Sequence, residues 1–121
     1  MSGEFIEALR GSNEVSLAVT GRVTGRQISN PVWFVQEGDT VYLLPVKGTD
    51  TSWFKNVRAI PSVRLTADGA SITGSAEPVT DYGRIADIIQ KFRTRYGREQ
   101  IERYYSKLDA AVEVSLPAEA G

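Results

Sequence analysis

The chain has 121 residues, of which 41% are hydrophobic, and it contains neither cysteine nor histidine. This length suits one domain that buries its own hydrophobic core. Without Cys or His, the usual zinc sites, thiolate nucleophiles and Ser-His-Asp or Cys-His catalytic arrangements are excluded, and we expect no metal centre. The 14 basic and 15 acidic residues give a net charge of -1. This balance argues against nucleic acid or an anionic membrane as the main partner.

The amino-terminal residues lack the basic start and apolar run of a signal peptide, and no stretch reaches the ~20 apolar residues of a membrane span. We therefore expect a cytoplasmic protein with no integral membrane segment. One domain is expected over residues 1–121. Its amino-terminal region, 1–14, should contain a short helix over 4–10, and residues 117–121 should form a flexible tail.

Alternation of polar and apolar residues predicts six strands. The predicted strands cover residues 15–20, 28–35, 40–46, 62–67, 71–79 and 112–116. Pro31 has no N–H to donate, so the second strand should lie at a sheet edge or contain a bulge. Glycine and aspartate at residues 37–39 predict a hairpin turn, which makes the second and third strands antiparallel neighbours.

Apolar residues at helical spacing predict three further helical segments. A short one carries Trp53 and Phe54, and the clearest one runs from about residue 81 to the glycine at position 97. The last is expected over 99–108. Together the elements predict an α+β domain, mainly β, built on a six-stranded antiparallel, barrel-like sheet with peripheral helices.

The segment at residues 20–26, Thr-Gly-Arg-Val-Thr-Gly-Arg, combines glycines with hydroxyl and guanidinium groups. Glycine lets backbone N–H groups approach an anion, and Arg22, Thr24 and Arg26 offer donors that suit phosphate oxygens. The alternative is an ordinary β-turn with solvated arginines. It is not a phosphate loop of the Walker type, because no Gly-Lys-Ser/Thr follows at the required spacing.

A second polar group follows the third predicted strand. Lys47 and Gly48 end that strand, and a helix start with Trp53, Lys55 and Asn56 comes soon after. A cation, an aromatic surface and backbone donors at a helix start suit a planar cofactor that carries a phosphate. Taken alone, Trp53 is more simply explained as a core residue.

Four segments together resemble a known family. These are residues 17–26, the Asn-Pro-Val-Trp-Phe-Val run at 30–35, Val-Lys-Gly at 46–48 and Trp-Phe-Lys-Asn-Val-Arg-Ala-Ile-Pro at 53–61. The combination is similar to the deazaflavin-dependent nitroreductase family, a branch of the flavin split-barrel superfamily that includes the pyridoxamine phosphate oxidases. The resemblance implies a six-stranded split β-barrel with coenzyme F-420 as cofactor, or FMN as the alternative.

The resemblance also implies a set of cofactor-binding residues, each matching a position that contacts the cofactor in the family. They are Arg22, Thr24, Gly25 and Arg26 of the first loop, Asn30 and Pro31 of the strand beside the ring, Lys47 and Gly48 at a strand end, and Trp53, Lys55 and Asn56 of the helix that closes over it.

The implied activity is hydride transfer to a small nitroaromatic, quinone or enone, with the protein supplying position and exclusion of water. Tyr96, Tyr104 and Tyr105 are weak candidates for a proton donor, in competition with water, and their spacing also suits core packing. Their catalytic roles, and any other catalytic residue, stay unknown at this point.

Two further classes of function remain open. The barrel could bind a hydrophobic ligand, haem or bilin without turnover, or it could serve protein contacts while residues 21–26 form a plain turn. In all cases we expect a homodimer, because the edge strands of so small a barrel favour being covered.

Overall fold

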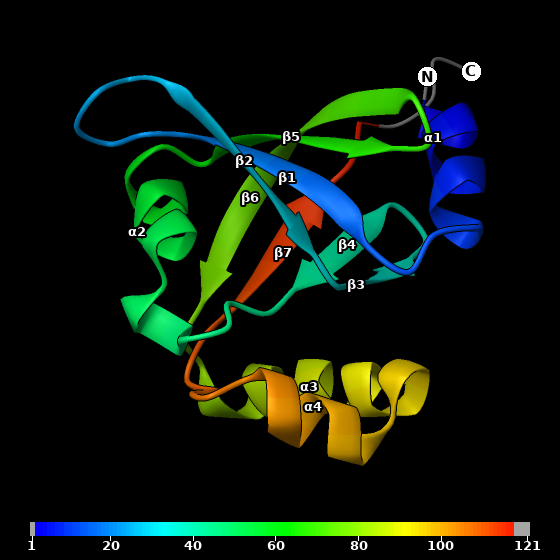
Figure 1. The fold of residues 1–121 in the computed structure, drawn as a ribbon, viewed down its shortest axis with the longest axis vertical. Coiled ribbons are helices and arrows are strands. Elements are labelled where there is room, and N and C mark those ends of the chain that lie inside the picture. The colour runs from blue at the N-terminus through cyan, green and yellow to red at the C-terminus, as the bar shows by residue number, and fades with distance from the viewer. Residues whose placement is uncertain (1, 118–121) are drawn as a thin grey trace.

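Within residues 2–117, the part of the chain that this computed structural model describes, seven strands form one curled antiparallel sheet (Figure 1). The strands are β1 (Val15–Thr20), β2 (Gln27–Val32), β3 (Phe34–Glu37), β4 (Thr40–Leu43), β5 (Ser62–Ala67), β6 (Ala70–Val79) and β7 (Ala111–Ser115). They follow one another across the sheet in the order β2-β1-β5-β6-β7-β4-β3. The sheet is a half-barrel, and β2 and β3 are its two edges.

The prediction of six strands is wrong, because the strand expected over 28–35 is two strands. β2 pairs along its length with β1, from Gln27 opposite Thr20 to Val32 opposite Val15. After Trp33, β3 pairs with β4 on the other side of the half-barrel. The β-branched and aromatic composition of this run favours one continuous strand, but tertiary pairing divides it. The edge position expected for Pro31 is confirmed, since β2 is an outer strand.

Two other boundaries differ from the prediction by three residues or more. β4 ends at Leu43 rather than continuing to residue 46, and a loop with the 3-10 helix η1 (Gly48–Asp50) follows. The last helix, α4 (Arg98–Tyr104), ends before residue 108. Tyr105 has extended backbone angles, with φ -98° and ψ 121°, and from there the chain leads back to β7. This return segment passes beside the loop after β4, where it forms an isolated parallel bridge between Lys47 and Lys107.

The other helices are α1 (Ser2–Arg10), α2 (Ser52–Ala59) and α3 (Tyr82–Tyr96). In Figure 1, α1 and α2 lie at different ends of the half-barrel, while α3 and α4 lie side by side beneath it. The amino-terminal helix is confirmed, and it begins two residues before its expected start. The expected flexible tail at 117–121 falls, from residue 118 on, outside the described residues. No helix in the described part is long and apolar enough to cross a bilayer.

Two hydrophobic clusters hold these layers together. One fills the half-barrel and joins β1, β5 and β7 to Phe5 of α1 and Phe54 of α2. The other lies between the sheet and the pair of helices α3 and α4. Alternation along β3 serves both clusters, because Phe34 enters the first and Val35 the second. This alternation allows one short edge strand to connect the barrel interior to the helical layer.

Candidate functional site

A cleft of about 390 Å³ lies where the end of β2, the loop after β4 and the end of α4 meet. Several of the residues expected to bind a cofactor line it, and so do two of the three tyrosine candidates. These lining residues are Asn30, Pro31, Lys47, Trp53, Tyr104 and Tyr105. A larger hollow of about 540 Å³ between α1 and the β5–β6 turn is lined by Glu4, Glu7 and Asp68, and this acidic lining does not suit an anionic ligand.

Aromatic rings form one wall of the cleft. Trp33 stacks with Tyr96 and with Tyr104, in each case with ring centroids 4.5 Å apart, at interplanar angles of 13° and 24°. Tyr105 meets Trp33 edge-on at 6.2 Å. Tyr104 remains 41% exposed, so part of this stack faces solvent at the cleft. Flat aromatic surface of this kind packs well against another ring.

The three tyrosine hydroxyls have different surroundings. The hydroxyl of Tyr96 lies 2.7 Å from the carbonyl oxygen of Asn13 and 3.0 Å from that of Phe34, and accepts from the Phe34 N–H at 3.1 Å. These contacts tie α3 to the sheet, and Tyr96 does not line the cleft. Tyr105 is buried, and burial, with smaller contributions from Tyr104 and Tyr96, raises its pKa. Its hydroxyl therefore stays neutral at physiological pH.

The glycine-containing loop after β1 packs on α2 rather than in the cleft. The backbone N–H of Arg22 and its guanidinium Nη1 both donate to Asn56 Oδ1, at 3.1 and 2.7 Å. Asn56 is only 4% exposed, so this double contact satisfies a buried oxygen. The side-chain oxygen of Asn56, a residue that the resemblance implies is cofactor-binding, is engaged by the loop.

Internal hydrogen bonds shape the rest of this loop. Gly21 N donates to Arg26 O at 2.7 Å, and Thr24 Oγ1 accepts from Arg26 N at 3.3 Å. Gly25 has a φ of 73°, a backbone conformation that favours glycine. The exposed side chains of Arg22, Thr24 and Arg26 lie outside the cleft lining, as does exposed Lys55 on α2.

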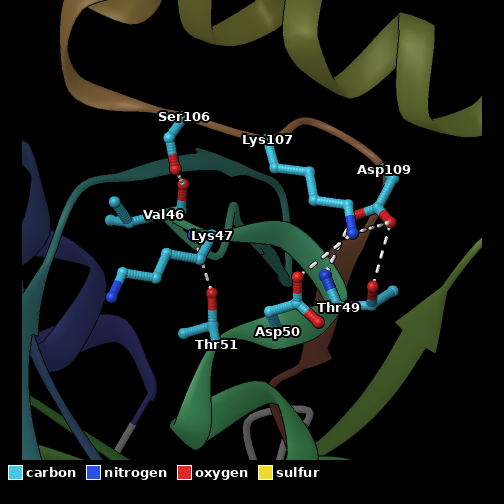
Figure 2. Close-up of polar contacts among 8 residues, drawn as sticks. All are labelled: Val46, Lys47, Thr49, Asp50, Thr51, Ser106, Lys107 and Asp109. Atoms are coloured by element: carbon cyan, nitrogen blue, oxygen red, sulfur yellow. Dashed lines mark hydrogen bonds and ion pairs between the residues drawn. The ribbon is translucent and has the colours of Figure 1, made fainter.

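The loop after β4 carries Lys47 to the cleft (Figure 2). The Lys47 N–H donates to Thr51 Oγ1 at 2.8 Å, and its side chain points away from the acidic residues of the loop. Gly48 has a φ of 54°, and a Cβ added there would collide with the carboxylate of Asp109. Gly48 is thus required by the backbone, and it does not line the cleft.

The start of α2 contributes backbone donors at the same place. Thr51 is the N-cap residue of α2, but its side chain accepts from Lys47 and does not cap the helix. Ser52 and Trp53, in the first turn, both line the cleft. N–H groups in a first helical turn lack helical partners and attract anions. Lys47 and the amino terminus of α2 therefore present positive charge together.

Residues 106–109 hold the Lys47 loop, and sequence reasoning missed them. Ser106 N donates to Val46 O at 2.9 Å, and Asp109 accepts from both the backbone N–H and the hydroxyl of Thr49, each at 2.9 Å. Desolvation acts to raise the pKa of Asp109, but the hydrogen bonds from Thr49 and the charge of Lys107 outweigh it, so the net shift is downward. No local motif links positions some 60 residues apart, so the sequence carries no signal for this contact.

The residues gathered at the cleft fit a planar, anionic cofactor such as the deazaflavin that the sequence resemblance implies. Trp53 and the Trp33–Tyr104 stack offer flat apolar surface, and Lys47 with the first turn of α2 offers positive charge. Within residues 2–117, the Lys47 ammonium forms no ion pair, so its charge is not neutralised by the protein. A phosphorylated ring system needs a cation for its phosphate and flat apolar surface for its rings, and this cleft offers both.

Solved structures confirm the split-barrel fold. An F420-H2 dependent reductase, FDR-A, superposes with a TM-score of 0.67 at 20% identity, over 85% of this chain and 94% of its own. A protein described as a domain-swapped dimer gives the same score and identity, over 94% of both chains. The heme storage protein HutZ from Vibrio cholerae gives 0.72 at 17% identity, over 98% of this chain and 90% of its own.

Sequence comparison is more specific than these structural likenesses. The chain matches no protein whose function has been curated. The model of a family described as F420H(2)-dependent quinone reductase matches residues 1–117, nearly the whole chain. Because that match spans both the cleft and the elements that build it, the protein belongs to the F420H2-dependent quinone reductase family, whose cofactor is reduced coenzyme F-420.

Proposed function

We propose that this protein is a reductase that uses reduced coenzyme F-420 to reduce a small quinone, nitroaromatic or conjugated enone. One observation carries the proposal, which is that Lys47, the first turn of α2 and stacked aromatic rings converge on one cleft. When bound, the reduced deazaflavin supplies a hydride. The chain's own residues then have to bind the cofactor, orient it towards the substrate and exclude water. None of these tasks needs a Cys or His.

Lys47 and the backbone N–H groups at the start of α2 are proposed to hold the phosphate of the cofactor. Both are at the cleft, and a charge-assisted contact to phosphate is stronger than a neutral one. Asn30 and Pro31, from the end of β2, and Trp53, from α2, are proposed to position the ring. Trp53 is 7% exposed, so its ring is held rigidly by the core while one part still lines the cleft.

Coenzyme F-420 carries an acidic tail beyond its phosphate, and the loop after β1 is proposed to meet this tail outside the cleft. Arg26 is exposed and forms no ion pair within residues 2–117, so its guanidinium is available to an anion. Arg22 and Asn56 are proposed to hold this loop against α2, and Thr24 and Gly25 to give it its shape. Exposed Lys55 is proposed to add positive charge on the same helix, and Gly48 to allow the turn that directs Lys47.

Tyr104 is the remaining tyrosine candidate for a proton donor to the product, in competition with water. Its ring lines the cleft and is partly exposed, whereas the hydroxyl of Tyr96 is engaged by backbone groups. Tyr105 lines the cleft too, but it is buried and its pKa is raised, which makes it a poor acid. We assign Tyr105 a packing role behind Trp33.

The proposal also covers the domain organisation, location and oligomeric state of the protein. We propose a single domain over residues 1–121, a cytoplasmic location and a homodimer. Support for the homodimer comes from β2, whose outer edge has no neighbouring strand among residues 2–117 and whose residues 27–31 are all exposed. A protein of the same fold is described as a domain-swapped dimer. Uncovered edge strands favour pairing with another chain.

Equilibrium titration tests the cofactor part of the proposal. Quenching of the fluorescence of Trp33 and Trp53 by F-420 at micromolar concentration, with no comparable quenching by FMN, is the expected result. The substrate part is tested by following loss of absorbance of the reduced cofactor with a quinone, a nitroaromatic and an enone in parallel. Binding without turnover of any of the three would leave a cofactor-binding protein and overturn the reductase.

A further inference from the structure

A carboxylate lines the cleft that is proposed to bind an anionic cofactor. Asp50, three residues after Lys47, is among the lining residues. An ionised carboxylate at this place would repel the phosphate of the cofactor and compete with it for the Lys47 ammonium. The site therefore binds an anion more tightly if another group compensates the charge of Asp50.

Lys107 supplies that compensation from a distant part of the chain. Its ammonium lies 3.2 Å from Asp50 Oδ2 and 3.6 Å from Asp109 Oδ2. Figure 2 shows the Lys107 side chain extending towards both carboxylates. The hydrogen bond to Asp50, followed by the charges of Asp109 and Asp50, raises the pKa of Lys107 above its usual value. Lys107 therefore stays charged across the physiological range and does not itself line the cleft.

Backbone contacts fix where this lysine lies. Ser106 N and Ser106 Oγ both donate to Val46 O, at 2.9 and 3.2 Å, and Asp109 holds the Thr49 N–H and hydroxyl. The segment 106–109 is thus bound to the loop on both sides of Lys107. This anchoring places the backbone of Lys107 where its side chain reaches both Asp50 and Asp109.

The side chain of Lys47, in the loop after β4, points in a different direction. Figure 2 shows its side chain extending away from Asp50 and Asp109, and within residues 2–117 it forms no ion pair. Lys107 therefore pairs with both carboxylates, those of Asp50 and Asp109. The charge of Lys47 stays uncompensated at the cleft.

We propose that Lys107 is a positioning residue, which neutralises Asp50 and so reserves Lys47 for the anionic part of the cofactor. This inference rests on the proposed function, because it presumes that F-420 binds at this cleft. Lys107 acts through Asp50 and Lys47 and touches neither cofactor nor substrate. The ion pair between Lys107 and Asp50 keeps the cleft positive although an acidic residue lines it.

The experiment measures the dissociation constant of F-420 by tryptophan fluorescence for the full chain and its variants. Lys107→Met should raise the dissociation constant roughly three- to fivefold, the scale of an exposed charge pair. Adding Asp50→Asn to Lys107→Met should restore the wild-type value, because the repelling carboxylate is then gone. Lys91→Met is the matched control, since Lys91 pairs with Glu37 at 2.9 Å between α3 and β3, away from the cleft, and it should change nothing.

Ionic strength separates this electrostatic role from a merely structural one. The difference between Lys107→Met and wild type should shrink as salt is raised towards 1 M, where charges are screened within about 3 Å. If Lys107→Met fails to fold, Lys107→Gln removes the same charge while keeping a hydrogen-bond donor, and the same loss is expected. Thermal unfolding of each variant verifies that it is folded.

The outcomes distinguish the two proposals. If wild-type protein does not bind F-420, the proposed function fails and this inference fails with it. If wild type binds but Lys107→Met binds equally well, only the inference is overturned. Loss of affinity that Asp50→Asn does not repair, or that salt does not diminish, also overturns it, because Lys107 would then act by shaping the loop.

Discussion

Lys47 shows how a single side chain acquires its importance from its neighbours. The resemblance to deazaflavin enzymes pointed to Lys47 and Trp53 through short motifs, and the structure places both at one cleft together with Asn30 and Pro31. Local sequence was sufficient there, since each motif lies within a few residues of a strand or helix end. It was insufficient for Lys107 and Asp109, whose contacts with residues 49 and 50 depend on how the last helix and strand are connected.

Lys47→Met should weaken binding of F-420 by about 1.5 to 3 kcal/mol, the range expected for loss of a charge-assisted contact. The measurement is the same fluorescence titration, compared with Lys91→Met as a lysine remote from the cleft. Unchanged affinity in Lys47→Met would show that the phosphate binds elsewhere and would remove the basis of the proposed site.

The burial of Tyr105 predicts that the free energy of unfolding falls at alkaline pH. Burial raises its pKa in the folded state above the value of 10.0 that applies to the unfolded chain. Above about pH 10 the unfolded state therefore loses a proton that the folded state keeps, and this group lowers the free energy of unfolding by about 1.4 kcal/mol per pH unit. Below pH 10 its contribution is constant.

Tyr105→Phe should accordingly flatten the alkaline limb of the stability curve. Urea denaturation between pH 8 and 11 gives the measurement, and Tyr82→Phe is the control because Tyr82 is 91% exposed. Parallel curves for wild type and Tyr105→Phe would contradict the burial of this hydroxyl.

At the scale of elements, the junction between β2 and β3 decides the architecture. Period-two patterning located the strands at residues 15–20 and 62–67 as the structure has them, because each is an inner strand that pairs on both sides and has apolar residues at every second position. The same reasoning merged β2 with β3, because strand propensity does not indicate which strand a residue pairs with, and the pairing partner changes at Trp33. It also extended α4 to residue 108, although the chain leaves the helix at Tyr105.

The contact between α2 and the loop after β1 gives a prediction about order in that loop. Asn56→Ala removes the acceptor of both Arg22 hydrogen bonds, and the loss of stability should be about 1 kcal/mol. The freed loop should become a better substrate for trypsin, which cleaves after Arg22 and Arg26. Limited digestion followed by mass spectrometry is the measurement.

Glu7→Ala is the matched control for Asn56→Ala, because it removes an exposed partner of Arg10 on α1. Cleavage after Arg22 that is equally slow in wild type and Asn56→Ala would mean that Asn56 does not order the loop.

For the whole molecule, the open half-barrel sets the expected assembly. Light scattering should give about twice the chain mass of 13.3 kDa, because the outer edge of β2 is exposed and has no partner strand within the described residues. Ile28→Lys places a charge on this edge strand and should shift the protein towards the monomer. A wild-type mass of 13.3 kDa would contradict the homodimer.

Trp33 has a mechanical significance that its ring contacts alone do not reveal. It is the single residue between β2 and β3, so the two free edges of the half-barrel are covalently joined at this point. At this joint the ends of β2 and β3 cannot move apart, because consecutive Cα atoms stay 3.80 Å apart. The rings of Tyr96 and Tyr104 stack on the same residue, so the joint between the two edge strands is also packed against the helical layer, directly beside the cleft.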